Sequence, residues 1–172
     1  MSMASASSTP RRPFPDDYLL KYSEEHVHYE LDHFFWLATG LGNGMQIGAP
    51  SQQAVVRINN ILIEGFALHL RNAIDFFHPR NSSKPTDVIA ADFLPTGMWE
   101  GIKPPISATL STARTRADKE MAHLTTARLF GTPPEKQWDF SALNVELKEL
   151  LRLMCTKALP FRLAANVMEL AK

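Results

Sequence analysis

An arginine, an acid and a histidine recur at one spacing in this sequence. Arg116, Glu120 and His123 are separated by four residues and then by three. At about 100° per residue, these offsets fall on one narrow face of a helix. An imidazole titrates near neutral pH and can transfer protons, and a guanidinium stays charged and binds phosphate through paired hydrogen bonds. With a carboxylate to orient the imidazole, the three groups fit the proton transfers and phosphate binding that cleavage of an RNA phosphodiester needs.

Two other segments repeat this spacing of a basic-type residue, an acid and a histidine. They carry His26, Glu30 and His33, and Arg71, Asp75 and His78, the latter with Asn72 beside the arginine. Residues three and four apart on a helix also form ordinary surface pairs worth a few tenths of a kcal/mol. Around 71–78 these polar residues form a stripe on an otherwise apolar helix. The stripe either faces solvent or lines a buried polar contact between helices, where its charges must be paired.

The same acids and histidines also fit a metal centre. Each set contains an acid followed three residues later by a histidine, the pair with which ferritin-like bundles hold two metal ions. The alternative ligand set is His26, Glu30, His33 and Glu64, with Glu146 or Glu149 as further acids. Because Arg71 and Arg116 share the faces of the proposed ligands, a cation there would be repelled. We therefore favour phosphate chemistry and expect no metal or other cofactor.

Helical periodicity covers most of the chain, and we expect no strand. The first predicted helix runs from Pro15 to the glycines of 40–44, and the second spans 52–78. The third starts after Ser107 and ends before Gly131, the fourth spans 141–159, and a short fifth follows Pro160. A short helix over 87–94, capped by Thr86, is expected in the connection before Pro104. The sequence thus predicts an all-α, four-helix-core bundle with a long connection between its second and third helices and a short C-terminal helix. We expect one domain over 15–172 after a disordered tail at 1–14.

Burial and localisation follow from composition. The second helix is apolar nearly all round, so we expect it to be the most buried. His69 and the lone Cys155 are predicted to pack in the core. The balanced formal charge of +0 argues against broad electrostatic capture of nucleic acid. No apolar run is long enough for a membrane span and no signal peptide is apparent, so a cytoplasmic location without membrane association is expected.

Both arginine–histidine segments resemble a known family signature. Arg116 to His123 and Arg71 to His78 read R-x6-H, which is similar to the R-x(4–6)-H signature of the HEPN superfamily of helical bundles. The stretch "RADKEMAHLT" resembles the form found in abortive-infection HEPN domains, and the resemblance covers roughly residues 16–160. The family's usual polar residue after the arginine is matched by Asn72 but not by Ala117. Asp118 or Lys119 would supply it with another geometry.

The resemblance implies a metal-independent endoribonuclease of toxin or defence type, or a noncatalytic RNA binder or scaffold. It also implies a homodimer in which the motifs of two subunits face each other across a shared cleft. Arg116, Glu120 and His123 are then the first candidate set, and RNA and an antitoxin protein are the expected partners. Because polar stripes also fix the register between helices, a dimeric interaction module without chemistry is the alternative.

Overall fold

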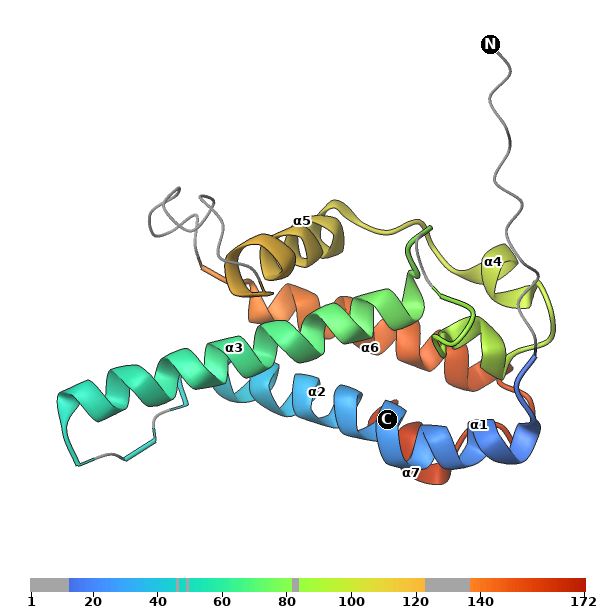
Figure 1. Cartoon of the computed structure of the whole chain (residues 1–172), viewed down its shortest axis with the longest axis horizontal. Helices are drawn as coiled ribbons and strands as arrows, with labels where there is room; N and C mark the ends of the chain where they lie inside the picture. Colours follow the sequence, from blue (N-terminus) through green and yellow to red (C-terminus); the bar gives the residue numbers. More distant parts are fainter. Residues whose placement is uncertain (1–12, 46, 49, 82–83, 123–136) are drawn as a thin grey trace, which may run out of the picture.

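The computed structural model describes residues 13–45, 47–48, 50–81, 84–122 and 137–172, with the backbone alone for 120–122, and this part of the chain is all-helical (Figure 1). The main helices, in chain order, are α1 (Asp16–Tyr22), α2 (His28–Gly42), α3 (Gln52–Phe77), α5 (Ala108–Arg116), α6 (Phe140–Lys157) and α7 (Ala165–Leu170). A π-helix, η1 (Ser23–Val27), joins α1 to α2 in one continuous rod, and a second, η3 (Ala117–Ala122), extends α5. The predicted all-α bundle is confirmed. The predicted tail falls almost wholly on residues 1–12, outside the described residues.

Helix starts follow the expected capping chemistry. The Ser51 hydroxyl accepts a hydrogen bond from the Ala54 amide, 3.2 Å away, and the Ser107 hydroxyl accepts one from Leu110, at 3.0 Å. These bonds satisfy amides that have no partner in the first helical turn. For α6 the cap is Asp139, whose carboxylate accepts from Ala142, so this helix begins slightly earlier than predicted.

The core lies where the α1–η1–α2 rod, the C-terminal half of α3 and α6 meet. Its buried side chains come from all three: Leu31 and Phe34; Phe66, Leu70, Ile74 and Phe77; Leu143, Leu147, Leu151 and Met154. The phenyl rings of Phe34 and Phe66 stack with centroids 5.7 Å apart. Interdigitated apolar side chains of this kind supply most of the stability of a helical bundle.

The long connection between α3 and α5 packs against the core. It contains a 3-10 helix, η2 (Ala90–Phe93), and a short helix, α4 (Met98–Ile102). The predicted short helix is therefore a single 3-10 turn, and its N-cap residue is Ile89 rather than Thr86, with the Ile89 amide donating to Asp92 Oδ2 at 2.8 Å. Trp99 of α4 is fully buried, and its indole nitrogen donates to the Phe77 carbonyl at 2.9 Å.

The prediction that α3 is the most buried helix holds for only half of it. Every fully buried residue of α3 lies at Phe66 or later, and Ile61 is 64% exposed. The physical reason is length: α2 ends at Gly42, and α3 continues past that end into the open (Figure 1). Within the described chain, no helix is long and apolar enough to cross a membrane.

Candidate functional site

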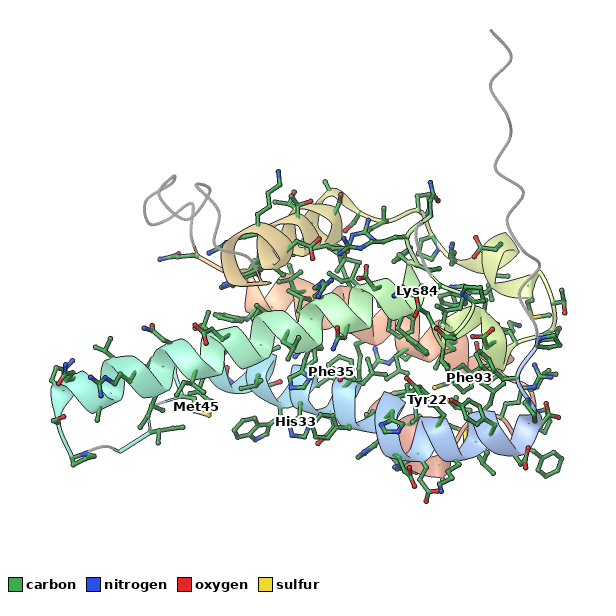
Figure 2. All side chains as sticks on the ribbon, viewed as in Figure 1. Tyr22, His33, Phe35, Met45, Lys84 and Phe93 are labelled. Carbon is green, nitrogen blue, oxygen red and sulfur yellow. The ribbon has the colours of Figure 1, made fainter. Side chains whose placement is uncertain are left out.

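A polar cleft of about 520 Å³ lies between the N-terminal rod and α3. The rod contributes Tyr22, His26 and Glu30, α3 contributes Arg71, Asn72 and Asp75, and the following connection contributes Arg80 and Asp87. Figure 2 shows Tyr22 on the side of the rod that faces this connection. The volume is typical of small-ligand sites. Three of the four residues of the second candidate set, Arg71, Asn72 and Asp75, therefore line one cavity together with His26 and Glu30 of the N-terminal set.

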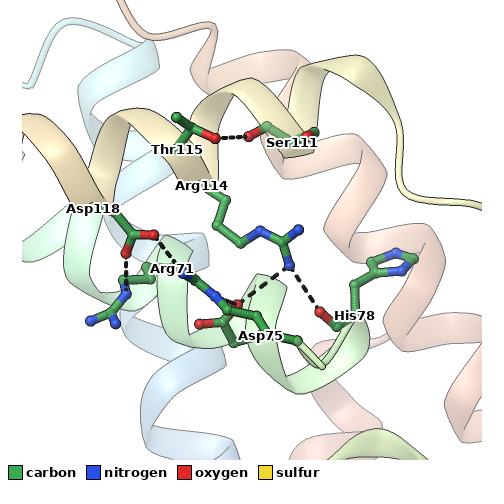
Figure 3. Close-up of polar contacts among 8 residues, drawn as sticks. Arg71, Asp75, His78, Ser111, Arg114, Thr115 and Asp118 are labelled. Carbon is green, nitrogen blue, oxygen red and sulfur yellow. Dashed lines mark hydrogen bonds and ion pairs between the residues drawn. The ribbon is translucent and has the colours of Figure 1, made fainter. Parts of the chain in front are cut away.

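Three arginines and two aspartates form one network at the α3 side of the cleft (Figure 3). Asp118 binds two arginines: Arg71 Nε lies 2.7 Å from its Oδ1, and Arg80 Nη1 donates to its Oδ2 at 2.6 Å. Asp75 accepts from Arg80 Nε at 2.9 Å and has Arg114 Nη1 within 3.5 Å. Three guanidinium groups against two carboxylates leave one formal positive charge in the network. Arg114 does not line the cleft, whose own charged residues are two arginines and three acids, so an anion there would be bound by directed guanidinium donors and not by net charge.

Two of these arginines have unused hydrogen-bond donors. Among the described residues, the terminal nitrogens of Arg71 have no partner, and its side chain is 36% exposed. Arg80 Nη2 is buried and is likewise without a hydrogen bond within the described chain. A buried N–H without an acceptor costs stability, and an acceptor brought by a ligand would remove that cost. Both arginines line the cleft, so a phosphate there could accept from either.

The network holds Asp118 and Arg80 in their charged forms. Burial alone would raise the pKa of Asp118, but the hydrogen bond and charge of Arg80 and the charge of Arg71 outweigh burial and lower it. The two aspartates in turn raise the pKa of Arg80 above its ordinary value, chiefly through their hydrogen bonds. Asp118 and Arg80 are therefore both charged at neutral pH, and the ion pairs to Asp118 orient Arg71 and Arg80 before any ligand binds.

The other wall of the cleft carries aromatic rings. Tyr22 and His26 have ring centroids 4.8 Å apart, and His26 is exposed. Burial, followed by the charges of Tyr18 and Glu30, raises the pKa of Tyr22, so its hydroxyl stays protonated and can donate. Rings on one wall and guanidinium groups on the other match the two parts of a nucleotide, a base to stack on and a phosphate to bind.

Glu30 links the rod to α3 beneath the cleft. Its Oε2 accepts from His69 Nδ1 at 2.7 Å and from Asn72 Nδ2 at 3.1 Å. These hydrogen bonds outweigh burial and lower the pKa of Glu30. His69 is buried and hydrogen-bonded, as predicted for a core histidine. The Asn72 amide, by contrast, is directed to Glu30 and serves to position it.

His78 does not join Arg71. α3 ends at Phe77, and His78 has φ −125° and ψ 71°, outside the helical range. The Arg71–His78 spacing predicts one face only if the helix continues, and here it stops one residue short. The His78 ring instead lines a second pocket, of about 270 Å³, with Ser107 and Glu146. Burial, together with Lys103 and Arg114, lowers the pKa of His78, so this imidazole is neutral at neutral pH.

The first candidate set is described only in part. Arg116 is the last residue of α5; its Nη1 donates to the Gln137 carbonyl at 2.9 Å, and its guanidinium lies 4.1 Å from the centre of the Trp138 ring. The side chain of Glu120 and all of His123 fall outside the described residues. The chain does bring the two R-x6-H segments together, because Asp118, two residues after Arg116, pairs with Arg71.

The alternative metal ligands are not grouped. Glu30 is bound by His69 and Asn72, His33 Nδ1 donates to the Tyr29 carbonyl at 2.9 Å, and Glu64 and His26 are exposed. In the described part of the chain, no three histidine, cysteine or acidic residues are placed to hold a metal ion. Burial raises the pKa of the Cys155 thiol to about 11, which leaves it a poor nucleophile.

Sequence reasoning missed Arg80 and Tyr22 and gave Asp118 only a secondary place. Arg80 follows a proline beyond the end of α3, so no helical spacing connects it to Arg71 or Asp118. The π-helices η1 and η3, next to Tyr22 and containing Asp118, shift the register that a 3.6-residue period assumes; such segments often occur at functional sites. No protein-family model, curated protein or solved structure matches the chain, so the functional argument rests on the geometry of the cleft.

Proposed function

We propose that the cleft between the rod and α3 binds single-stranded RNA, and that the protein cleaves the bound RNA without a metal ion. One observation carries this proposal: a single cleft has unused guanidinium donors on one wall and aromatic rings on the other. The donors belong to Arg71 and Arg80, and the rings to Tyr22 and His26. Single-stranded nucleic acid is commonly held by base stacking together with backbone electrostatics. The HEPN-like R-x6-H pattern points to the same class of ligand.

Each wall has a separate role in this proposal. Arg71 and Arg80 bind phosphate oxygens, and Asp118 and Asp75 keep the two guanidinium groups extended toward the cleft. Tyr22 stacks on a nucleobase, with the His26 ring beside it. Because the cleft also contains Glu30 and Asp87, phosphate binding depends on these directed donors and not on a broad positive surface.

Cleavage requires two proton transfers. A base removes the proton of the ribose 2′-hydroxyl, the 2′-oxygen attacks phosphorus, and an acid donates a proton to the departing 5′-oxygen. His26 is the exposed imidazole in the cleft and serves as the base. We assign the acid to His123, the histidine of the first R-x6-H pattern. His78 is excluded from this role because it is buried in the other pocket and neutral.

The binding step is tested by fluorescence anisotropy with a short, labelled single-stranded RNA. Arg71→Gln and Tyr22→Ala are each expected to weaken binding by about tenfold or more, equivalent to roughly 1.4 kcal/mol. Lys157→Gln, which removes one charge from the exposed end of α6, is the control and should leave affinity unchanged. Equal affinity for all three variants and the wild type would place any RNA binding elsewhere.

The chemical step is tested by RNA turnover in EDTA. Wild-type protein is expected to cleave, and His26→Ala and His123→Ala are each expected to lose activity by about a hundredfold, the usual contribution of a general acid or base. Loss of activity in EDTA, restored by added metal, would contradict the metal-independent mechanism.

A second candidate function is a noncatalytic, dimeric interaction module. One observation favours it, the exposed apolar half of α3. Binding of the RNA without turnover in any buffer would move the assignment from enzyme to RNA-binding scaffold.

A further inference from the structure

The N-terminal half of α3 is apolar but only partly covered, with Leu62 packed against the edge of the core. Residues 52–65 contain Val55, Val56, Ile58, Ile61, Leu62 and Ile63, yet none of them is fully buried. Figure 1 shows this part of α3 extending beyond α2 and α6. Exposing a large apolar side chain forgoes roughly 1.5–3 kcal/mol of burial energy, so a helix half of this composition gains by being covered.

One face of this half-helix has a symmetric order of charges. Arg57, Ile61, Glu64 and Leu68 lie at offsets of 0, 4, 7 and 11 residues and form a single stripe along α3, here called the α3 stripe. All four are exposed, with Ile61 at 64% and Leu68 at 52%. Arg57 and Glu64 make no ion pair within the described chain. The stripe thus places one unpaired cation and one unpaired anion on either side of an exposed isoleucine.

We infer that two copies of the protein associate through the α3 stripe, with the two α3 helices antiparallel. Arg57 and Glu64 each lie 3.5 residues, or about 5 Å along the axis, from a point between residues 60 and 61. A twofold axis at that point places Arg57 opposite Glu64 of the partner subunit, and the reciprocal pair forms by symmetry. Ile61 and the partner's Ile61 flank the axis and cover each other. A pair of aligned helices of this kind packs in the usual bundle geometry.

The charge order selects this arrangement over its competitors. Parallel pairing would place Arg57 beside the partner's Arg57 and Glu64 beside the partner's Glu64, and like charges at such positions are destabilising. A different protein would need to supply the mirrored charges with the same spacing, whereas a second copy supplies them automatically.

The inferred dimer differs from the dimer that the family resemblance implies, in which the R-x6-H motifs of two subunits face each other across one shared cleft. Arg71 lies 10.5 residues from the proposed axis, so the two copies of Arg71 are about 30 Å apart along α3. Each subunit therefore keeps a complete cleft of its own, between its own rod and its own α3. The inference is independent of the proposed function, because it concerns residues outside the cleft.

Charge reversal provides the test, with mass measured by light scattering after size exclusion. Wild type is expected at twice the chain mass, and Arg57→Glu and Glu64→Arg, each alone, at once the chain mass. An equimolar mixture of these two variants is expected to return to twice the chain mass, because every contact again joins opposite charges. The double variant, Arg57→Glu with Glu64→Arg, is expected to dimerise by itself.

The control is Lys157→Glu, an equal charge reversal on exposed α6, which should leave the mass unchanged. Circular dichroism establishes that each single variant is folded, and recovery in the mixture would itself require folded chains. A monomeric wild type, single variants that remain dimeric, or a mixture that stays monomeric would each overturn the inference.

Discussion

Glu30 couples the stability of the bundle to pH. Its folded-state pKa lies below the ordinary value of 4.5, because hydrogen bonds from His69 and Asn72 outweigh the effect of burial. A carboxylate with a lowered pKa contributes stability above its unfolded-state pKa and loses that contribution as the pH falls through its folded-state value. Stability is therefore expected to decline below about pH 5 as Glu30 becomes protonated.

Glu30→Gln tests this coupling. The variant is expected to lose about 1 kcal/mol of unfolding free energy at neutral pH, since it replaces charge-assisted hydrogen bonds with neutral ones. It should also lose less further stability than wild type between about pH 5 and pH 3. Urea titrations at several pH values measure both effects. Glu24→Gln, on the exposed side of the same rod, is the control, and parallel pH curves for Glu30→Gln and wild type would refute the coupling.

At the same scale, His78 marks where sequence reasoning failed. Its spacing from Arg71 is correct for one helical face, and Arg71, Asn72 and Asp75 do line a single cleft. A residue before proline is disfavoured in the helical conformation, however, and His78 precedes Pro79. Its backbone leaves the helix, and its ring turns into the other pocket. The proline was visible in the sequence, but the new direction of the ring depends on tertiary packing.

At the scale of elements, two serine caps that look alike in sequence differ in structure. Ser51 only caps α3, whereas Ser107 caps α5 and also donates to Glu146 of α6, with its hydroxyl 2.5 Å from Oε2. Ser107→Ala should therefore lose the cap, worth about 1 kcal/mol, and a further 1 kcal/mol or so from an interhelical bond to a charged group. Ser51→Ala should lose only the first amount. Chemical denaturation of both variants measures the two losses of unfolding free energy. Equal losses would show that the hydrogen bond to Glu146 contributes nothing to stability.

Helix positions were predictable from the chain, and their burial was less so. Capping serines, breaking glycines and prolines, and apolar periodicity placed α3, α5 and α6 to within a few residues where the structure describes their ends. Burial depends on which neighbour each helix meets, and the apolar face of α3 runs on past the end of α2. Likewise, no local pattern connects Arg80 to Asp118, because 38 residues separate them in the chain.

On the scale of the whole molecule, α3 contributes to the core, to the proposed RNA-binding cleft and to the proposed dimer interface. Its C-terminal half supplies Phe66, Leu70 and Ile74 to the core and Arg71 to the cleft, and its exposed half carries the α3 stripe. A stable core therefore holds the cleft in shape, independently of whether the stripe is paired. Dimerisation would place two preformed clefts at a fixed separation, so the dimer and the monomer should differ in avidity for long RNA more than in affinity for short RNA.

The two ends of the described chain are held together by Arg162, in the turn between α6 and α7. Its Nε donates to Asp16 at the start of α1, at 2.6 Å, and its Nη1 donates to the Asp92 carbonyl in η2, at 2.9 Å. One side chain, 22% exposed, thus joins three segments that are distant in sequence. Contacts between distant segments are made only in the folded state, so their removal should lower the stability of the whole bundle.

Arg162→Ala is expected to lower the unfolding free energy by about 2 kcal/mol, because it leaves the Asp92 carbonyl and the Asp16 carboxylate without this partner. Arg152→Ala is the matched control, since Arg152 also donates twice to carbonyls, those of Ala171 and Lys172, but is exposed and joins α6 only to the chain end. Its loss should be well below 1 kcal/mol, as for other exposed charge contacts. Thermal and urea unfolding give both values. If the two arginines contribute equally, the turn at Arg162 is a local contact and not the point at which α1, η2 and α6 are joined.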